Sequence, residues 1–188
     1  MTDVRTLKEE GLAKYRNGDF RTAANCWREA VEMLGDLGDA EEGAELDFSD
    51  WDFERSLYLN LAMAHLKCHE PREAMRALKC ILLGGEDEPE IMLKTLYRMA
   101  LCYKELGEWD DFDRCARAML EVDGESVLAK RLIQEATSLR ARDSAASSKL
   151  AKHMFSGVGA WSEGRAWAVG QEDTSAAKAY LSTTYLLH

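Results

Sequence analysis

The sequence predicts an all-α fold in which one helix-turn-helix unit occurs three times. Only two prolines, Pro71 and Pro89, interrupt 188 residues, and apolar residues recur at the spacing of amphipathic helices. Three segments share the pattern of a helix, a short polar turn and a second helix, and they span residues 7–34, 56–82 and 96–123. Repetition of this kind is typical of a helical repeat protein.

The turns of the three units align. They read Asn17-Gly18-Asp19-Phe20, Cys68-His69-Glu70-Pro71 and Leu106-Gly107-Glu108-Trp109. A left-handed residue at the end of the first helix favours Gly, and the acid that follows suits the start of the second helix. Pro71 stands where the first turn of a helix tolerates proline. The first and second turns lie 51 residues apart, and the second and third lie 38 residues apart. A repeat of about 34 residues accounts for both intervals if about 17 residues are inserted in the first and about 4 in the second.

Small residues recur where the two helices of a unit must approach closely. They are Gly11, Ala23, Ala30, Ala62, Ala74 and Ala100, while the third unit has Phe112 and then Ala116 where the pattern has a small residue and then an aromatic one. That exchange of sizes within one contact conserves packed volume. The large side chains expected to pack between helices, rather than to stack on a ligand, are Trp27, Leu78, Tyr97 and Tyr103.

A seventh helix is expected from about residue 125 to 155, because that stretch lacks proline and glycine and has apolar residues at helical spacing. Its first half would cover the exposed face of the third unit, as a repeat array requires. We therefore expect a repeat domain over residues 1–155 and a tail over 156–188, with a short helix at 176–187. An alternative role for the tail is to anchor a second partner through Trp161 and Trp167.

The net charge of −10 is concentrated in one segment. Eleven acids and no Lys or Arg occur from Glu29 to Glu54, and the rest of the chain has 23 acids and 24 bases. This segment contains an acidic insert at 35–53, which we expect to be a solvated loop. An evenly spread net charge of this sign would argue against nucleic-acid and anionic-membrane partners, neither of which we expect, but here the charge lies mostly in one segment. A cytoplasmic location is expected, since there is no leader pattern and no long apolar run.

Catalytic and metal-binding patterns are weak. The five cysteines form no Cys-x-x-Cys pair and are expected to be reduced thiols. His65, Cys68 and His69 have metal-ligand spacing on a helix, but no second cluster accompanies them. No nucleophile stands with a base, so we expect no enzyme, no cofactor and no metal. A further alternative is a basic amphipathic target for calmodulin, formed by Arg140, Arg142, Lys149 and Lys152.

The chain resembles the tetratricopeptide-repeat domains of the large immunophilins (co-chaperones of the FK506-binding and cyclophilin types) and of the aryl-hydrocarbon-receptor-interacting protein. The resemblance covers about residues 4–155 and rests on LKEEG, the acidic insert, LNLAMAHLK, KTLYRMALCY and KLAKHMF. It implies a right-handed superhelix of three repeats followed by a long seventh helix. It also implies docking of the acidic Glu-Glu-Val-Asp tail of heat-shock protein 90 or 70 class chaperones.

A peptide that ends in Asp presents two adjacent carboxylates, so a site for it needs several converging cationic or amide donors. The family's clamp has Lys and Asn on the first helix of repeat one, Asn on that of repeat two, and Lys and Arg on that of repeat three. Four positions match: Lys8, Asn60, Lys94 and Arg98. Leu12 stands in place of the first Asn and has no donor, and Met63 and Lys67 are expected to border the same groove.

The leading expectation is a non-catalytic co-chaperone adaptor that binds such a tail. The runner-up is a scaffold with the same fold that binds an internal peptide or a folded partner without the clamp. Large immunophilins have a prolyl isomerase domain before this region. We therefore expect either a stand-alone adaptor or a fragment of a longer co-chaperone.

Overall fold

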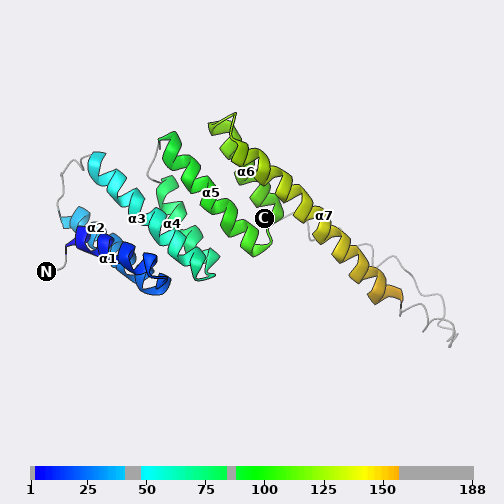
Figure 1. Cartoon of the computed structure of the whole chain (residues 1–188), viewed down its shortest axis with the longest axis horizontal. Coiled ribbons are helices and arrows are strands. Elements are labelled where there is room, and N and C mark those ends of the chain that lie inside the picture. The colour runs from blue at the N-terminus through cyan, green and yellow to red at the C-terminus, as the bar shows by residue number, and fades with distance from the viewer. Residues whose placement is uncertain (1–2, 41–47, 84–87, 157–188) are drawn as a thin grey trace, which may run out of the picture. The chain divides into compact units, whose positions relative to one another are not determined.

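The computed structural model describes residues 3–40, 48–83 and 88–156, and within them the chain forms seven helices and no strand (Figure 1). The helices are α1 (Val4–Arg16), α2 (Phe20–Ala40), α3 (Phe48–Lys67), α4 (Pro71–Leu83), α5 (Pro89–Leu106), α6 (Trp109–Val122) and α7 (Val127–Ser156). None of the described helices has the length and apolar character needed to cross a membrane.

The first six helices pack as three antiparallel pairs, which confirms the predicted all-α repeat. Helix α1 packs on α2, α3 on α4, and α5 on α6. Successive pairs also touch, since α2 packs on α3, α4 on α5, and α3 on α5. In Figure 1 the pairs follow one another across the view in chain order.

The three tight turns have the left-handed residue that the alignment predicts. Gly18 has φ +82° and Gly107 has φ +75°, while His69 adopts φ +58° at the equivalent position although it has a side chain. Each left-handed residue lies one or two positions after the first helix of its pair, and the second helix begins two residues later, at Phe20, Pro71 or Trp109. The turn chemistry read from the sequence is therefore confirmed in all three units.

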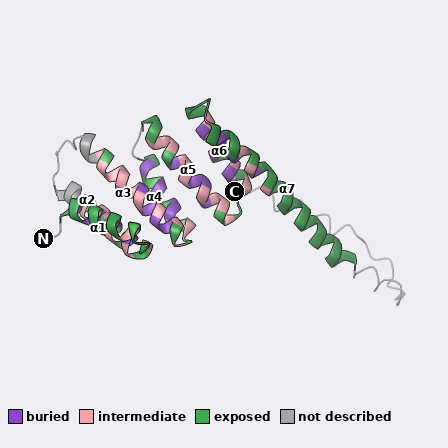
Figure 2. Ribbon diagram, viewed as in Figure 1, coloured by how far each residue is buried: buried purple, intermediate pink, exposed green. Residues whose placement is uncertain are grey.

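The core, buried between the helices (Figure 2), includes the small and large residues that the sequence singled out for packing. Gly11 and the alanines at the predicted close approaches are buried. Trp27, Leu78 and Phe112 are at most 1% exposed, and Tyr97 and Tyr103 pack against the core from its edge. The aromatic residues of the repeats are thus structural, as predicted.

The helices before the second and third turns begin earlier than predicted, at Phe48 and Pro89 rather than near residues 56 and 96. The expectation of a loop over the acidic insert 35–53 is wrong at both ends, because α2 continues to Ala40 and α3 begins at Phe48. Phe53 explains the early start of α3: it lies one turn before the buried Leu57 and packs against the core. Residues 41–47 lie outside the described part of the chain.

The seventh helix, α7, runs close to its predicted bounds. The chain separates into two units, Met1–Asp143 and Ser144–His188, so the first unit holds the three helix pairs and the first half of α7. Residues 144–156 are helical and exposed. The predicted domain boundary at residue 155 stays a prediction, and the tail with Trp161, Trp167 and the helix at 176–187 lies outside the described residues.

Candidate functional site

The candidate clamp consists of Lys8, Asn60, Lys94 and Arg98, and its members come from the first helix of each pair. Lys8 lies on α1, Asn60 on α3, and Lys94 and Arg98 on α5. Helix α3 packs on α5, and Lys8 of α1 reaches Ser56 of α3 through a hydrogen bond. The joint action of the four residues in one site stays a prediction.

Lys8 is held against the second repeat. Its Nζ donates a hydrogen bond of 2.6 Å to Ser56 Oγ and lies 4.2 Å from the centre of the Phe53 ring. The indole N–H of Trp27 donates to the Lys8 carbonyl at 3.1 Å, which fixes the backbone at this point. Burial lowers the pKa of Lys8. No carboxylate within the described ranges pairs with this ammonium, so an anionic ligand would find a partly desolvated cation without a counter-ion.

Arg98 is the most deeply placed cation of the candidate clamp. Its Nε is buried and has no hydrogen-bond partner among the described residues, while Nη1 donates only a long bond of 3.4 Å to the Lys94 carbonyl. Burial lowers the pKa of Arg98, and the nearby Tyr15 hydroxyl on α1 acts in the opposite direction. A buried donor without an acceptor is costly in free energy, so Nε of Arg98 is an unsatisfied group in the candidate clamp.

Lys94 pairs with an acid of its own helix. Its Nζ lies 2.6 Å from Glu90 Oε1, and both side chains are at least half exposed. The hydrogen bond from Lys94 lowers the pKa of Glu90. Exposed ion pairs one turn apart contribute little to stability, so Lys94 can exchange Glu90 for a ligand carboxylate at small cost.

Asn60 and Leu12 differ in what they offer a ligand. The half-buried Asn60 lies between the buried Leu59 and Leu61, and its amide makes no hydrogen bond to any described residue. Leu12 is 38% exposed and is not among the residues that pack on the core. Asn60 therefore has free donors, whereas Leu12 presents an apolar surface to solvent.

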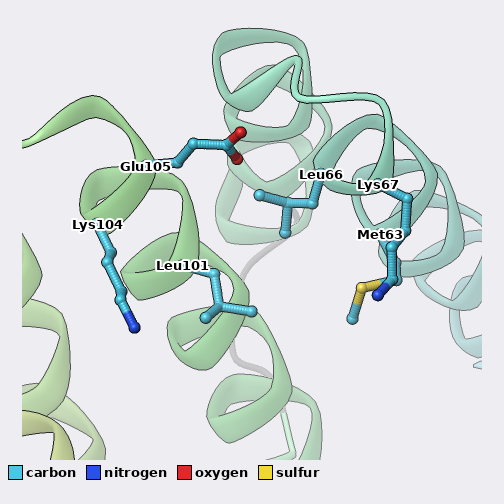
Figure 3. Close-up of a pocket in the computed structure, with 6 residues that line it drawn as sticks. All are labelled: Met63, Leu66, Lys67, Leu101, Lys104 and Glu105. Carbon is cyan, nitrogen blue, oxygen red and sulfur yellow. The ribbon is translucent and has the colours of Figure 1, made fainter.

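A hollow of about 370 Å³ lies between α3 and α5. Figure 3 shows Met63, Leu66 and Lys67 on one side and Leu101, Lys104 and Glu105 on the other. Met63 and Lys67 are the two groove residues expected from the sequence. Two of the other four, Leu101 and Glu105, could have been found by continuing the helical spacing, because they lie three and seven residues after Arg98.

Two of the three charged side chains in this α3–α5 hollow are already paired. Lys104 Nζ lies 2.6 Å from Glu135 Oε1 of α7, and Glu105 Oε1 lies 2.6 Å from His69 Nδ1. Lys67 has no ion-pair partner in the described part of the chain. The hollow therefore combines an apolar floor of Met63, Leu66 and Leu101 with one available cation.

The helical His/Cys cluster has other partners. His65 is 5% exposed, and its Nδ1 lies 2.8 Å from Glu70 Oε2 and its Nε2 lies 3.4 Å from Arg28 Nη2. His69 binds Glu105 instead. No group of three or more metal-ligating side chains is found within the residues that the structure describes.

Comparison with known proteins defines the fold. Neither the family models nor the curated proteins include a match to this chain. Among solved structures, the C-terminal domain of a putative FK506-binding protein from Plasmodium falciparum has a TM-score of 0.61 at 17% identity, covering 75% of this chain and 90% of its own.

Two further neighbours were solved with peptides. The first repeat domain of Spaghetti (RPAP3), bound to the HSP90 peptide SRMEEVD, has a TM-score of 0.56 at 14% identity and covers 74% of this chain and 94% of its own. The second such domain of human RPAP3, in complex with the HSP70 peptide SGPTIEEVD, has a TM-score of 0.51 at 19% identity and covers 70% and 92%. The chain thus has the tetratricopeptide-repeat fold, a class of helical scaffold. The predicted fold class is confirmed.

Proposed function

We propose that this chain is a non-catalytic, cytoplasmic adaptor that binds the acidic carboxyl-terminal tail of heat-shock protein 90 or 70 class chaperones. The clamp residues would be Lys8, Asn60, Lys94 and Arg98, as in the large immunophilins and the aryl-hydrocarbon-receptor-interacting protein that the sequence resembles. Met63 and Lys67 would contact residues further up the tail.

The observation that carries this proposal is that two partly buried cations, Lys8 and Arg98, have no carboxylate partner among the described residues. Arg98 has a buried donor without an acceptor, and Lys8 has no counter-ion within the described ranges. Folding has thus removed water from both without replacing it by a carboxylate, which is unfavourable unless a ligand supplies one. A tail that ends in Asp supplies two, at the main-chain terminus and in the last side chain.

The peptide-bound neighbours support the same class of ligand. The Spaghetti (RPAP3) and human RPAP3 domains were solved with peptides that end in Glu-Glu-Val-Asp. Because these neighbours are similar to this chain in fold alone, the proposal rests on Lys8 and Arg98. The neighbours supply only the type of peptide that is used to test it.

A second candidate function is a scaffold for an internal peptide or a folded partner. The exposed Leu12 favours it, because one expected donor of the clamp is replaced by an apolar side chain. A lost hydrogen bond to a charged group costs about 1.5–3 kcal/mol, or one to two decades in affinity. A strong preference for a free carboxylate would exclude this candidate.

The test is a calorimetric titration with Ser-Arg-Met-Glu-Glu-Val-Asp as the free acid and as its carboxyl-terminal amide. We expect the free acid to bind at least about tenfold more tightly, because amidation removes one of the two carboxylates. Arg98→Ala and Lys94→Ala should each weaken binding of the free acid at least about tenfold.

Lys79→Ala is the matched control, since Lys79 is an exposed lysine of α4. Thermal unfolding of each variant separates loss of binding from loss of fold. Equal binding of the acid and the amide, or no binding of either, would contradict the proposal.

A further inference from the structure

The last part of α7, residues 144–156, has large apolar side chains in contact with solvent. Leu150, Met154 and Phe155 are 61%, 63% and 72% exposed, whereas Leu132 in the first half of the helix is buried in the core. A single exposed apolar residue needs no explanation, but several that lie together on one helix mark an interaction surface. The fold leaves this surface free for a partner.

The same stretch is basic. It contains Lys149, Lys152 and His153 and no Asp or Glu, and neither lysine has an ion-pair partner in the described part of the chain. An α-helix turns by about 100° per residue, so the three exposed apolar side chains fall within about 140° of its circumference. The three basic side chains fall within about 100° on the other side. This part of α7 is therefore an amphipathic helix with a cationic polar face.

An anionic lipid surface fits this arrangement. A helix that lies in a membrane interface has apolar side chains toward the acyl chains and Lys or Arg on its other side. Cytoplasmic leaflets have a negative surface potential, which attracts such cations within about 10 Å. A second copy of the helix fits less well: a helix of this length spans about 20 Å, too little for two copies to bury the roughly 1,200 Å² of a stable interface.

Local charge decides this interaction more than net charge does. The net charge of −10 led us to expect no membrane partner, but the acids that produce it lie mainly between Glu29 and Glu54. Residues 144–156 contribute two lysines and no acid. Because attraction to a charged surface falls off within a Debye length, a helix that touches the surface responds to its own charges first.

We propose that residues 144–156 form an anchor that lies in the plane of an anionic membrane surface. Leu150, Met154 and Phe155 enter the boundary between headgroups and acyl chains, and Lys149 and Lys152 contact the lipid phosphates. This inference goes beyond the proposed function, since none of these residues belongs to the candidate clamp.

The experiment is co-sedimentation of the full chain with vesicles of phosphatidylcholine alone or with about 30% phosphatidylserine. We expect at least about fivefold more binding to the phosphatidylserine vesicles and a clear loss of that binding in high salt. Leu150→Ser combined with Phe155→Ser, and Lys149→Gln combined with Lys152→Gln, should each reduce it at least about fivefold.

Leu83→Ser is the matched control, because Leu83 of α4 is 85% exposed and should not affect binding. All variants should keep the melting temperature of the unchanged chain, since every changed side chain is exposed. Equal binding to both kinds of vesicle, binding to neither, or full binding by the Leu150/Phe155 variant would overturn the inference. So would calcium-loaded calmodulin binding this helix while the vesicles do not, because the surface would then serve an acidic protein.

Discussion

At the scale of single residues, the contact between Gly11 and Trp27 brings α1 and α2 together. A Cβ atom at position 11 would lie 2.5 Å from Trp27 Nε1, a distance that real contacts do not reach. Trp27 is 1% exposed, and its indole N–H is engaged by the Lys8 carbonyl. The ring therefore cannot retreat without breaking that hydrogen bond, which also fixes the backbone beneath a residue of the candidate clamp.

Replacing Gly11 by Ala should lower the free energy of unfolding by about 1–3 kcal/mol, because the added methyl group forces α1 away from α2. Urea unfolding followed by far-ultraviolet circular dichroism measures the change. Gly35→Ala is the control: a Cβ at Gly35 in α2 meets nothing within 4 Å, so the greater helix propensity of Ala should raise stability by up to about 1 kcal/mol. If both substitutions changed the free energy of unfolding in the same direction and by the same amount, the Trp27 contact would not explain the effect of Gly11→Ala.

At the scale of helices, a polar link joins the first and second repeats. The Glu70 carboxylate, in the turn before α4, lies 2.9 Å from Arg21 Nη2 of α2 and 2.8 Å from His65 Nδ1 of α3. Arg28, also on α2, can only donate, so Nε2 of His65 is the acceptor and Nδ1 bears the proton given to Glu70. Glu70 thus connects the end of α3 to the helix of the preceding repeat.

This link should make stability depend on pH. The hydrogen bond from His65, aided by the charges of Arg21 and Arg28, holds the pKa of Glu70 below its ordinary value of 4.5. Because the folded pKa is the lower one, the unfolded chain binds more protons in this range, and stability present above the unfolded pKa is lost as the pH falls through the folded value.

Glu70→Gln should therefore be less stable than the unchanged protein at neutral pH and should lose less stability between about pH 6 and about pH 3. Thermal unfolding across this range gives both quantities. Glu73→Gln, at an exposed ion pair with Arg76 on the same helix, should change little at neutral pH. If the melting temperatures of Glu70→Gln and of the unchanged protein fell equally with falling pH, the Glu70 carboxylate would not be the source of the pH dependence.

The helix-scale features also show how far sequence reasoning extends. Turn positions were predictable because Gly18, Gly107 and Pro71 each have a strong local preference. The starts of α3 and α5 were not, because contacts such as Phe53 against the core decide them and propensity does not. The candidate clamp positions came from spacing and resemblance, whereas the desolvation of Lys8 and Arg98 depends on neighbours from other repeats and required the structure.

At the scale of the whole molecule, net charge is a poor guide to the partner. The chain has a net charge of −10, yet Lys8, Lys67 and Arg98 are cations without a carboxylate partner in the described structure. Acids elsewhere in the sequence set the total, while the local charge of a site decides which ligand it attracts. An acidic peptide is therefore compatible with an acidic protein.

The extent of the stable domain follows from burial along α7. Ala129, Leu132 and Ala136 are buried, and Glu135 and Arg140 pair with Lys104 of α5 and Asp110 of α6. These contacts close the apolar face left by the last repeat, as a repeat array requires. All residues from 140 to 156 are exposed, so the helix beyond Asp143 adds no buried surface.

A chain that stops after Asp143 should therefore keep its melting temperature within about 3 °C and its affinity for the free-acid peptide. A chain that stops after Gly124 should unfold at least about 10 °C lower or fail to fold, because the apolar faces of α5 and α6 lose their cover. Differential scanning calorimetry of both truncated chains provides the comparison. If the shorter chain melted at the same temperature as the longer one, α7 would not be the cap that covers the last repeat.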